Sequence, residues 1–130
     1  MRTLVEDLMA TDVAAVCTDA PTRAIAEVLD GRHVSAVPVV DLQNRVVGVV
    51  SEADIIHHRY TDGTAEQIMS RPAITVRADQ PADVAAQLID HFGIKRLPVV
   101  DDLGRLVGII SRADLVHLYA RGGTFRSAEA

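Results

Sequence analysis

The sequence repeats itself at a constant offset of 60 residues. Residues 38–41, with the sequence PVVD, recur as residues 98–101, and the stretch 48–54 recurs in similar form as 108–114. A single copy of about 60 residues buries too little apolar surface to be more than marginally stable alone, so the two copies are expected to share one core. The repeat therefore predicts two related halves, and we expect any functional site at the seam between them.

The composition narrows the class of protein. Of 130 residues, 48% are hydrophobic and 24% are charged, as in an ordinary globular domain, and no stretch approaches the roughly 18 apolar residues of a membrane span. The formal net charge of -5 and the 3% content of aromatic residues argue against a nucleic-acid partner, because phosphates attract cations and unstacked bases need aromatic platforms. The N-terminal residues carry carboxylates where a signal peptide is apolar. We therefore expect a cytoplasmic protein with no membrane or nucleic-acid partner.

Catalytic and metal-binding patterns are missing from the sequence. Cys17 is the single cysteine, so no intramolecular disulfide can form, and the five histidines show no zinc-type spacing with cysteine or carboxylate. No nucleophile has a plausible base, and neither a P-loop nor a Gly-x-Gly-x-x-Gly pattern occurs. The sequence predicts no catalytic residues, no metal site and no catalytic cofactor, so we expect that the protein is not an enzyme.

Each copy is expected to fold as a βαββα unit with a short helix in front, which gives an α+β fold class. Capping-box patterns open the short helices, aspartates cap the longer helices ahead of a proline, and paired apolar runs form a buried hairpin. The boundaries predicted for the two copies are short helices from Thr3 to Met9 and from Thr64 to Met69, strands at 13–16 and 73–76, N-caps at Asp19 and Asp79, hairpin strands at 37–40 and 46–50 and at 97–100 and 106–110, and closing helices capped by Ser51 and Ser111.

The repeat also predicts the organisation of the chain. Residues 1–60 and 61–120 are the two repeats, and residues 121–130 are expected to be a flexible tail because they include two adjacent glycines and no apolar period. The hairpin turns place Asn44 and Gly104 at one equivalent position, where both residue types tolerate a positive φ.

One motif combines a glycine, two aliphatic residues, a serine and an aspartate as Gly-h-h-Ser-x-x-Asp, where h is aliphatic. It occurs at residues 48–54 and 108–114, each time where a strand is expected to lead into a helix. A helix N-terminus offers free N–H groups to a phosphate, and a nearby carboxylate can accept two hydrogen bonds from a ribose diol. A capping pair explains the same serine and aspartate without any ligand. Both interpretations remain open from the motif alone.

The combination of these motifs resembles a tandem pair of cystathionine β-synthase (CBS) domains, known as a Bateman module. The resemblance covers about residues 4–118 and rests on residues 34–41, residues 94–101 and both Gly-h-h-Ser-x-x-Asp stretches. It implies two βαββα repeats packed as a pseudo-twofold pair through their sheets. It also implies clefts between the repeats that bind an adenosine-containing ligand such as AMP, ADP, ATP, S-adenosylmethionine or a dinucleotide. Modules of this family usually regulate and do not catalyse, and they often form homodimers.

The resemblance assigns residues to a preferred cleft. Asp114 would hold the ribose diol, Ser111 would contact phosphate or ribose, and Lys95 and Arg96 would meet phosphate. Adenine would lie against small and apolar residues of the first copy. The residues predicted for this preferred cleft are Val13, Ala14, Val34, Ser35, Ala36, Lys95, Arg96, Ser111, Arg112 and Asp114.

A second cleft follows from the same pattern with the copies exchanged, but its charges differ. Ser35 and Ala36 stand where the preferred cleft has its two cations, and Glu52 stands where it has Arg112. A charge-assisted hydrogen bond contributes roughly 1.5–3 kcal/mol, so the loss of two cations lowers affinity by more than about tenfold. The residues predicted for this weaker cleft are Ser51, Asp54, Ala73, Ile74, Ile94 and Lys95.

Two functional hypotheses of different classes follow. The first is a regulatory module that binds an adenine nucleotide between its repeats and thereby alters its association with itself, as a homodimer, or with an effector protein. The second is a structural oligomerisation module whose clefts stay empty, in which Ser-x-x-Asp serves only as a helix cap.

Overall fold

The structure, a computed structural model, describes residues 2–124 and has an α+β fold in two compact units. We call residues 14–73 the N-unit. The C-unit consists of residues 74–124 together with the N-terminal residues 2–13. From residue 125 onward, the tail expected at 121–130 lies outside the described residues. Within residues 2–124, no helix is long and apolar enough to cross a membrane.

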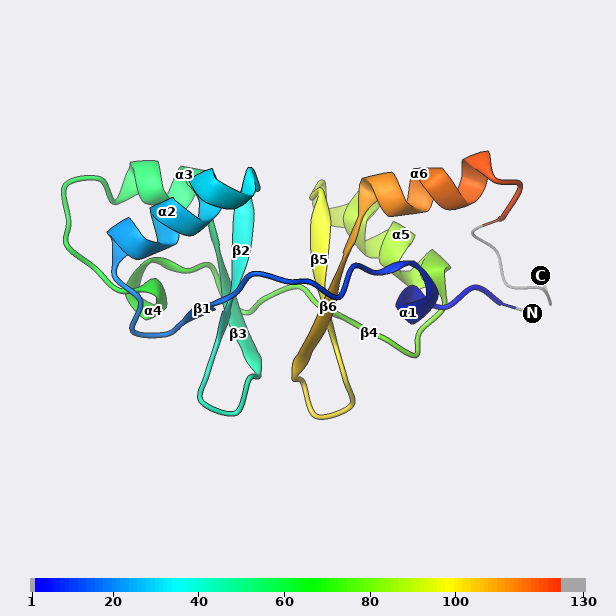
Figure 1. Cartoon of the computed structure of the whole chain (residues 1–130), viewed down its shortest axis with the longest axis horizontal. Coiled ribbons are helices and arrows are strands. Elements are labelled where there is room, and N and C mark those ends of the chain that lie inside the picture. Colours follow the sequence, from blue (N-terminus) through cyan, green and yellow to red (C-terminus); the bar gives the residue numbers. More distant parts are fainter. Residues whose placement is uncertain (1, 125–130) are drawn as a thin grey trace. The chain divides into compact units, whose positions relative to one another are not determined.

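Each unit contains a mixed three-stranded sheet and its own set of helices (Figure 1). The N-unit elements are β1 (Val16–Cys17), α2 (Thr22–Arg32), β2 (Ala36–Val40), β3 (Val46–Ser51), α3 (Glu52–His57) and α4 (Ala65–Ile68). The C-unit elements are α1 (Val5–Leu8), β4 (Val76–Arg77), α5 (Ala82–Phe92), β5 (Arg96–Val100), β6 (Leu106–Ser111) and α6 (Arg112–Ala120).

The two sheets share one topology, which confirms the hairpin of the predicted βαββα order. In the N-unit the strand order is β1-β2-β3, with β1 parallel and β3 antiparallel to β2. In the C-unit the order is β4-β5-β6 with the same directions. The hairpin pairs Ala36 with Ser51 in the first sheet and Arg96 with Ser111 in the second. The start of each middle strand therefore lies beside the serine that ends the next one.

Residues 2–13 of the first repeat belong to the C-unit, and residues 61–73 of the second repeat belong to the N-unit. We call these two stretches the exchanged segments. The compact units therefore do not coincide with the sequence repeats 1–60 and 61–120. In the C-unit, Val5 N–H donates to the Gln80 carbonyl at 2.8 Å, and Ala10 exchanges two backbone hydrogen bonds with Ile109. In the N-unit, Ala65 N–H donates to the Ala20 carbonyl at 2.9 Å, and Ser70 exchanges two with Val49. The same hydrogen bonds thus occur in both units, between residues whose numbers differ by 60.

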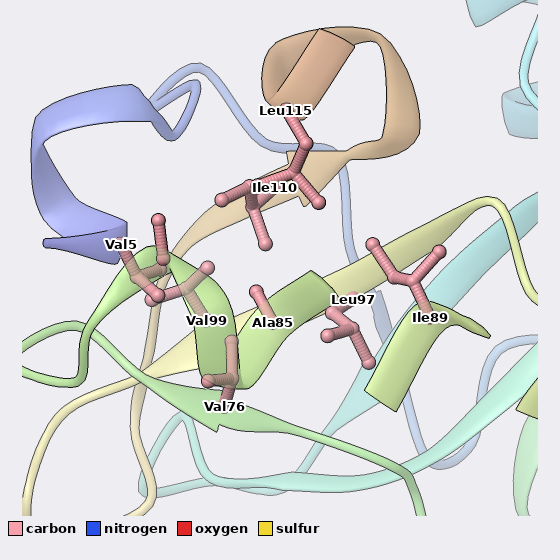
Figure 2. Packing of buried hydrophobic residues seen from close by; sticks show 9 residues of the cluster. Val5, Val76, Ala85, Ile89, Leu97, Val99, Ile110 and Leu115 are labelled. Atoms are coloured by element: carbon pink, nitrogen blue, oxygen red, sulfur yellow. The ribbon is translucent and has the colours of Figure 1, made fainter. Parts of the chain in front are cut away.

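The apolar core of the C-unit closes around this exchanged segment. Val5 of α1 is fully buried and packs with Val76, Val99 and Ile110 (Figure 2). Burying a side chain of this size stabilises the fold by roughly 1.5–3 kcal/mol. In the N-unit core the equivalent position is the fully buried Ala65 of α4, beside Ile68. Each core is therefore incomplete without a segment that the sequence supplies from the other repeat.

The glycine of each Gly-h-h-Ser-x-x-Asp motif lies against an exchanged segment. A Cβ added at Gly108 would lie 2.5 Å from Sδ of Met9 and 2.9 Å from the Ala10 carbonyl oxygen. At Gly48, the neighbours are Met69 and the Ser70 carbonyl oxygen, at equally short range. Each glycine of the Gly-h-h-Ser-x-x-Asp motif therefore makes room for the exchanged segment.

Three of the predicted boundaries at the exchanged segments are wrong. The strands expected at 13–16 and 73–76 form only at Val16–Cys17 and Val76–Arg77, because residues 13 and 14, like 73 and 74, belong to different units. The first short helix begins at Val5 with Leu4, not Thr3, as its N-cap, and Asp7 accepts the Leu4 N–H at 2.8 Å.

The predicted caps Asp19 and Asp79 are also wrong, since Pro21 and Pro81 occupy the N-cap positions. The first free N–H group of each helix needs no side-chain cap, because a backbone carbonyl of an exchanged segment accepts its hydrogen bond. Thr22 N–H donates to the Gly63 carbonyl at 3.1 Å, and Ala82 N–H donates to the Thr3 carbonyl at 2.9 Å. Asp79 instead forms an ion pair with Arg77 at 2.9 Å.

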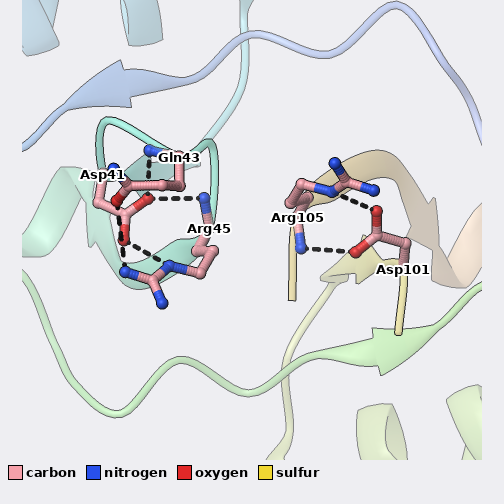
Figure 3. A network of polar contacts seen from close by, with 5 residues as sticks. All are labelled: Asp41, Gln43, Arg45, Asp101 and Arg105. Atoms are coloured by element: carbon pink, nitrogen blue, oxygen red, sulfur yellow. Dashed lines mark hydrogen bonds and ion pairs between the residues drawn. The ribbon is translucent and has the colours of Figure 1, made fainter. Parts of the chain in front are cut away.

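The two hairpin turns carry the same polar network (Figure 3). Asp101 Oδ1 accepts the backbone N–H of Arg105 at 2.9 Å, and its Oδ2 pairs with the Arg105 guanidinium at 2.7 Å. Asp41 and Arg45 repeat this arrangement at 2.9 and 2.8 Å. Asn44 and Gly104 adopt φ values of 64° and 79°, which confirms the predicted turn position.

These turn carboxylates predict a stability loss in acid. The Arg105 backbone N–H, and then its guanidinium, hold the pKa of Asp101 below the ordinary value of 3.8. A carboxylate with a lowered folded-state pKa stabilises the fold above its unfolded pKa, and this contribution disappears as the pH falls through the folded-state pKa. We expect Asp101→Asn to reduce the drop in melting temperature between about pH 5 and about pH 3. Asp102→Asn, an exposed neighbour in the same turn, is the matched control, and an equal effect of both variants would contradict the prediction.

Candidate functional site

The two Ser-x-x-Asp pairs form reciprocal capping boxes, as predicted for helices capped by Ser51 and Ser111. In the C-unit, Ser111 N–H donates to Asp114 Oδ2 at 2.8 Å, and Asp114 N–H donates to Ser111 Oγ at 3.2 Å. In the N-unit, Ser51 and Asp54 make the same two bonds at the same distances. The capping interpretation of the motif is therefore confirmed as local structure.

The capping box uses only one oxygen of each aspartate. Every hydrogen bond that residues 2–124 give to the Asp114 side chain reaches Oδ2, and the same holds for Asp54. Both carboxylates are half-buried at a strand-to-helix junction. Oδ1 of each aspartate is thus an acceptor that the described part of the fold leaves unused. The cap and a ligand contact are compatible on one side chain.

In the C-unit, three cations lie near this capping box. The Lys95 carbonyl accepts the Arg112 N–H at 2.9 Å, and the Cα of Arg96 is the strand partner of Ser111. We call Lys95, Arg96, Ser111, Arg112 and Asp114 the C-cluster. Its three cationic side chains are exposed, and none forms an ion pair within residues 2–124. Arg112 also occupies the first position of a nine-residue helix, where the helix dipole disfavours a cation. These three cations beside a helix N-terminus are suited to binding an anion.

The equivalent place in the N-unit has the opposite charge. The Ser35 carbonyl accepts the Glu52 N–H at 2.9 Å, and Ala36 is the strand partner of Ser51. We call Ser35, Ala36, Ser51, Glu52 and Asp54 the N-cluster. It contains two carboxylates and no cation. The same backbone frame therefore presents two different electrostatic environments.

The predicted site residues divide between the two units. The structure brings together Lys95, Arg96, Ser111, Arg112 and Asp114 in one unit, and Ser35, Ala36, Ser51 and Asp54 in the other. Of the predicted apolar lining, Ala14 and Val34 pack against the N-unit core, and Ile74 and Ile94 pack against the C-unit core. Val13 is half-buried in the C-unit and Ala73 in the N-unit.

Sequence reasoning missed the contact of two methionines with the motif glycines. Met9 lies over Gly108, three residues before Ser111, and Met69 lies in the same way over Gly48. Both methionines recur at the 60-residue offset, which is the signal that could have identified them. Among residues 2–124, no three histidine, cysteine, aspartate or glutamate side chains are close enough to hold a metal ion.

A family model for the CBS domain matches the chain twice, over residues 5–60 and 65–121. Among curated relatives, L-aspartate semialdehyde sulfurtransferase of Methanocaldococcus jannaschii is 30% identical over 118 residues, which are 90% of this chain and 23% of that protein. An uncharacterized 17.7 kDa protein of Acidianus ambivalens is 30% identical over 118 residues, which are 88% of this chain and 72% of that protein. The chain thus spans under a quarter of the sulfurtransferase.

Solved structures share the fold at similar levels of identity. The CBS domain pair of protein MJ0100, in complex with 5'-methylthioadenosine and S-adenosyl-L-methionine, has a TM-score of 0.82 and 29% identity, covering 94% of this chain and 99% of that chain. CBSX2 in complex with AMP has a TM-score of 0.81 and 27% identity, covering 91% and 96%. The cytosolic domain of the Mg2+ channel MgtE in complex with ATP has a TM-score of 0.78 and 28% identity, covering 86% and 47%.

Proposed function

The chain belongs to the CBS domain family, with two copies of the domain, and we propose that it is a regulatory module that binds an adenosine-containing ligand. The observation that carries the proposal is the C-cluster, where three cationic residues that form no ion pair within residues 2–124 lie next to a helix N-terminus and an aspartate with one unused oxygen. Cations and helix N–H groups bind phosphate, and the aspartate can accept hydrogen bonds from a ribose diol. Three structurally similar proteins were solved in complex with AMP, with ATP or with S-adenosyl-L-methionine, which supports this ligand class.

The proposed ligand would use residues of both repeats. In the preferred cleft, the ribose diol binds Asp114, phosphate meets Lys95 and Arg96, and the adenine lies against the small residues around Ser35 and Ala36. In the weaker cleft, Asp54 takes the place of Asp114, and its neighbour Glu52 repels phosphate. The two clefts therefore differ in affinity for an anionic nucleotide. The nucleotide acts as a regulatory ligand and not as a catalytic cofactor.

Regulation would operate through association. A ligand that binds two associated modules better than one shifts the equilibrium by its difference in affinity. We propose that the ligand changes either the stability of a homodimer of the chain or the affinity of the chain for an effector protein.

A second candidate function is supported by the complete capping boxes. Ser111 and Asp114 form reciprocal hydrogen bonds that cap the N-terminus of α6, so the motif stabilises this helix without a ligand. In that case the chain is an oligomerisation module with empty clefts.

Thermal unfolding with a nucleotide panel separates these two functions. AMP, ADP, ATP and S-adenosylmethionine are tested against GTP and inorganic triphosphate as controls. A ligand at about 100 times its Kd adds about 2.7 kcal/mol of stability, which raises Tm by several degrees for a chain of this size. We expect a shift with at least one adenosyl compound and a smaller one with inorganic triphosphate. No shift with any adenosyl compound contradicts the proposal and favours the oligomerisation module.

A further inference from the structure

The two cores have the same plan but are filled differently at two positions. Where a residue and its equivalent 60 positions later are both buried, most pairs are identical or differ by a single methylene group or its branching. Two pairs differ by more, and they differ in opposite directions. The pairs buried in both units are Val5/Ala65, Val16/Val76, Ile25/Ala85, Leu29/Ile89, Val37/Leu97, Val39/Val99, Val40/Val100 and Val50/Ile110.

The two opposite changes in size meet in each core. In the C-unit, the larger Val5 of α1 and the smaller Ala85 of α5 are both fully buried in one cluster (Figure 2). In the N-unit, the smaller Ala65 of α4 and the larger Ile25 of α2 are both fully buried in the equivalent cluster. Each core therefore combines one large and one small side chain, but the large one comes from the exchanged segment in the C-unit and from the long helix in the N-unit.

Backbone hydrogen bonds hold these positions close together in both units. Val5 N–H donates to the Gln80 carbonyl at 2.8 Å, and Ala82 N–H donates to the Thr3 carbonyl at 2.9 Å, so α1 begins beside the first turn of α5. Ala85 follows Ala82 by three residues and lies on the same face of α5. The equivalent hydrogen bonds link α4 with the start of α2 in the N-unit. Because both units use the same backbone bonds, these bonds do not decide which exchanged segment packs in which unit.

Side-chain size does distinguish the two exchanged segments. If residues 61–73 packed in the C-unit, Ala65 would lie beside Ala85 and leave a cavity. If residues 2–13 packed in the N-unit, Val5 would lie beside Ile25 and overfill the core. Cavities and overpacking both destabilise a close-packed interior, so the mismatch would be unfavourable in both units at once.

We propose that the pairs Val5–Ala85 and Ala65–Ile25 select, by complementary size, the unit in which each exchanged segment packs. A 60-residue repeat makes a second arrangement available, in which each repeat packs its own first segment against its own long helix and hairpin. The two size-matched pairs disfavour that self-contained arrangement and favour the exchanged one. The selection acts within the core of each unit and is independent of any ligand.

Three variants with the amino-acid composition of the wild type test this selection. V5A/A65V exchanges the two residues of the segments, and I25A/A85I exchanges the two residues of the long helices. Each change leaves a cavity in one core and overfills the other, so we expect each to lower Tm by about 10 °C or more. The quadruple variant V5A/A65V/I25A/A85I restores a matched pair in both cores and is expected to melt within about 4 °C of the wild type. Circular dichroism measures Tm, and a quadruple variant that loses the sum of the two double variants would overturn the proposal.

Methyl contacts observed by NMR test where the segments pack, which a change in stability alone does not show. In the wild type, the Val5 methyl groups are expected to show nuclear Overhauser effects with Ile110 of the C-unit core. In V5A/A65V, the valine introduced at position 65 should show them with Ile110 as well, since the self-contained arrangement is now the matched one. In the quadruple variant, the same valine should contact Val50 of the N-unit core instead.

The opposite NMR result would contradict the selection. If V5A/A65V folds and its new valine contacts Val50 and not Ile110, the exchanged segment stays in its unit despite the mismatch, and the size-matched pairs do not select it. If V5A/A65V is too unstable for NMR, the Tm of the quadruple variant decides between the two outcomes, because only complementary pairs let it recover.

Discussion

Replacing Gly108 with alanine is expected to lower the free energy of unfolding by about 3 kcal/mol and the melting temperature by roughly 10 °C. The new methyl group would lie 2.5 Å from Met9 Sδ and 2.9 Å from the Ala10 carbonyl oxygen. Both distances are shorter than van der Waals contact. The methionine can move, but Ala10 exchanges two backbone hydrogen bonds with Ile109, at 2.8 and 2.9 Å, so the carbonyl cannot. Thermal and denaturant unfolding provide the measurement.

Two further variants make this test specific. Gly31→Ala is the matched control, because its position in α2 has nothing within 4 Å and helix propensity favours alanine there by roughly 0.5–1 kcal/mol. Combining Gly108→Ala with Met9→Ala should cost less than the sum of the single changes, because the shortened side chain removes the sulfur from the overlap. If Gly108→Ala unfolds like the wild type, residues 9 and 10 do not pack on β6.

The second large effect is expected on nucleotide affinity. Asp114→Asn retains an oxygen that can accept the Ser111 N–H, so the helix cap survives, while the charge and the second acceptor are lost. Two hydrogen bonds from a ribose diol to a carboxylate contribute several kcal/mol, so Kd for the best adenosyl ligand should rise about 100-fold. Titration calorimetry measures the affinity, and a melting curve without ligand confirms that the cap is intact.

Asp54→Asn is the matched control at the repeat-equivalent position. Its two backbone capping bonds have the same lengths as those of Asp114, and Ser51 Oγ donates one further hydrogen bond to Asp54 Oδ2 at 3.0 Å, so the structural cost of Asp54→Asn should be at least as large. The N-cluster has Ser35, Ala36 and Glu52 where the C-cluster has three cations. Asp54→Asn should therefore change the Kd of the preferred cleft very little. Equal losses of affinity in the two variants would contradict unequal clefts.

Local sequence patterns predicted the elements that are stabilised by local interactions. Ser51 and Ser111 cap their helices as the Ser-x-x-Asp spacing requires, because both members of a capping box lie within one helical turn. The hairpin and its turn also follow from local pattern, since Asn44 and Gly104 are among the few residue types that tolerate a positive φ. The charge difference between the clusters around Asp54 and Asp114 is likewise present in the sequence.

The predictions that failed concern ends of elements whose partners are distant in sequence. Asp19 and Asp79 looked like caps, but the helix N–H groups donate to carbonyls that the exchanged segments place there. The strand expected at 13–16 was shortened because the chain passes from one unit to the other between residues 13 and 14. No local pattern contains this information, because capping and strand pairing depend on which groups arrive from elsewhere in the chain.

The duplication, the α+β elements of each half and the residues at which the two halves differ in charge could all be predicted from the residues alone. Only the three-dimensional structure shows that the first segment of each repeat packs in the other unit, and that Gly48 and Gly108 leave room for this contact. The physical reason is that periodicity and capping are encoded over a few residues. The choice of which core buries Val5 depends on long-range packing, for which a 60-residue repeat offers two equivalent partners.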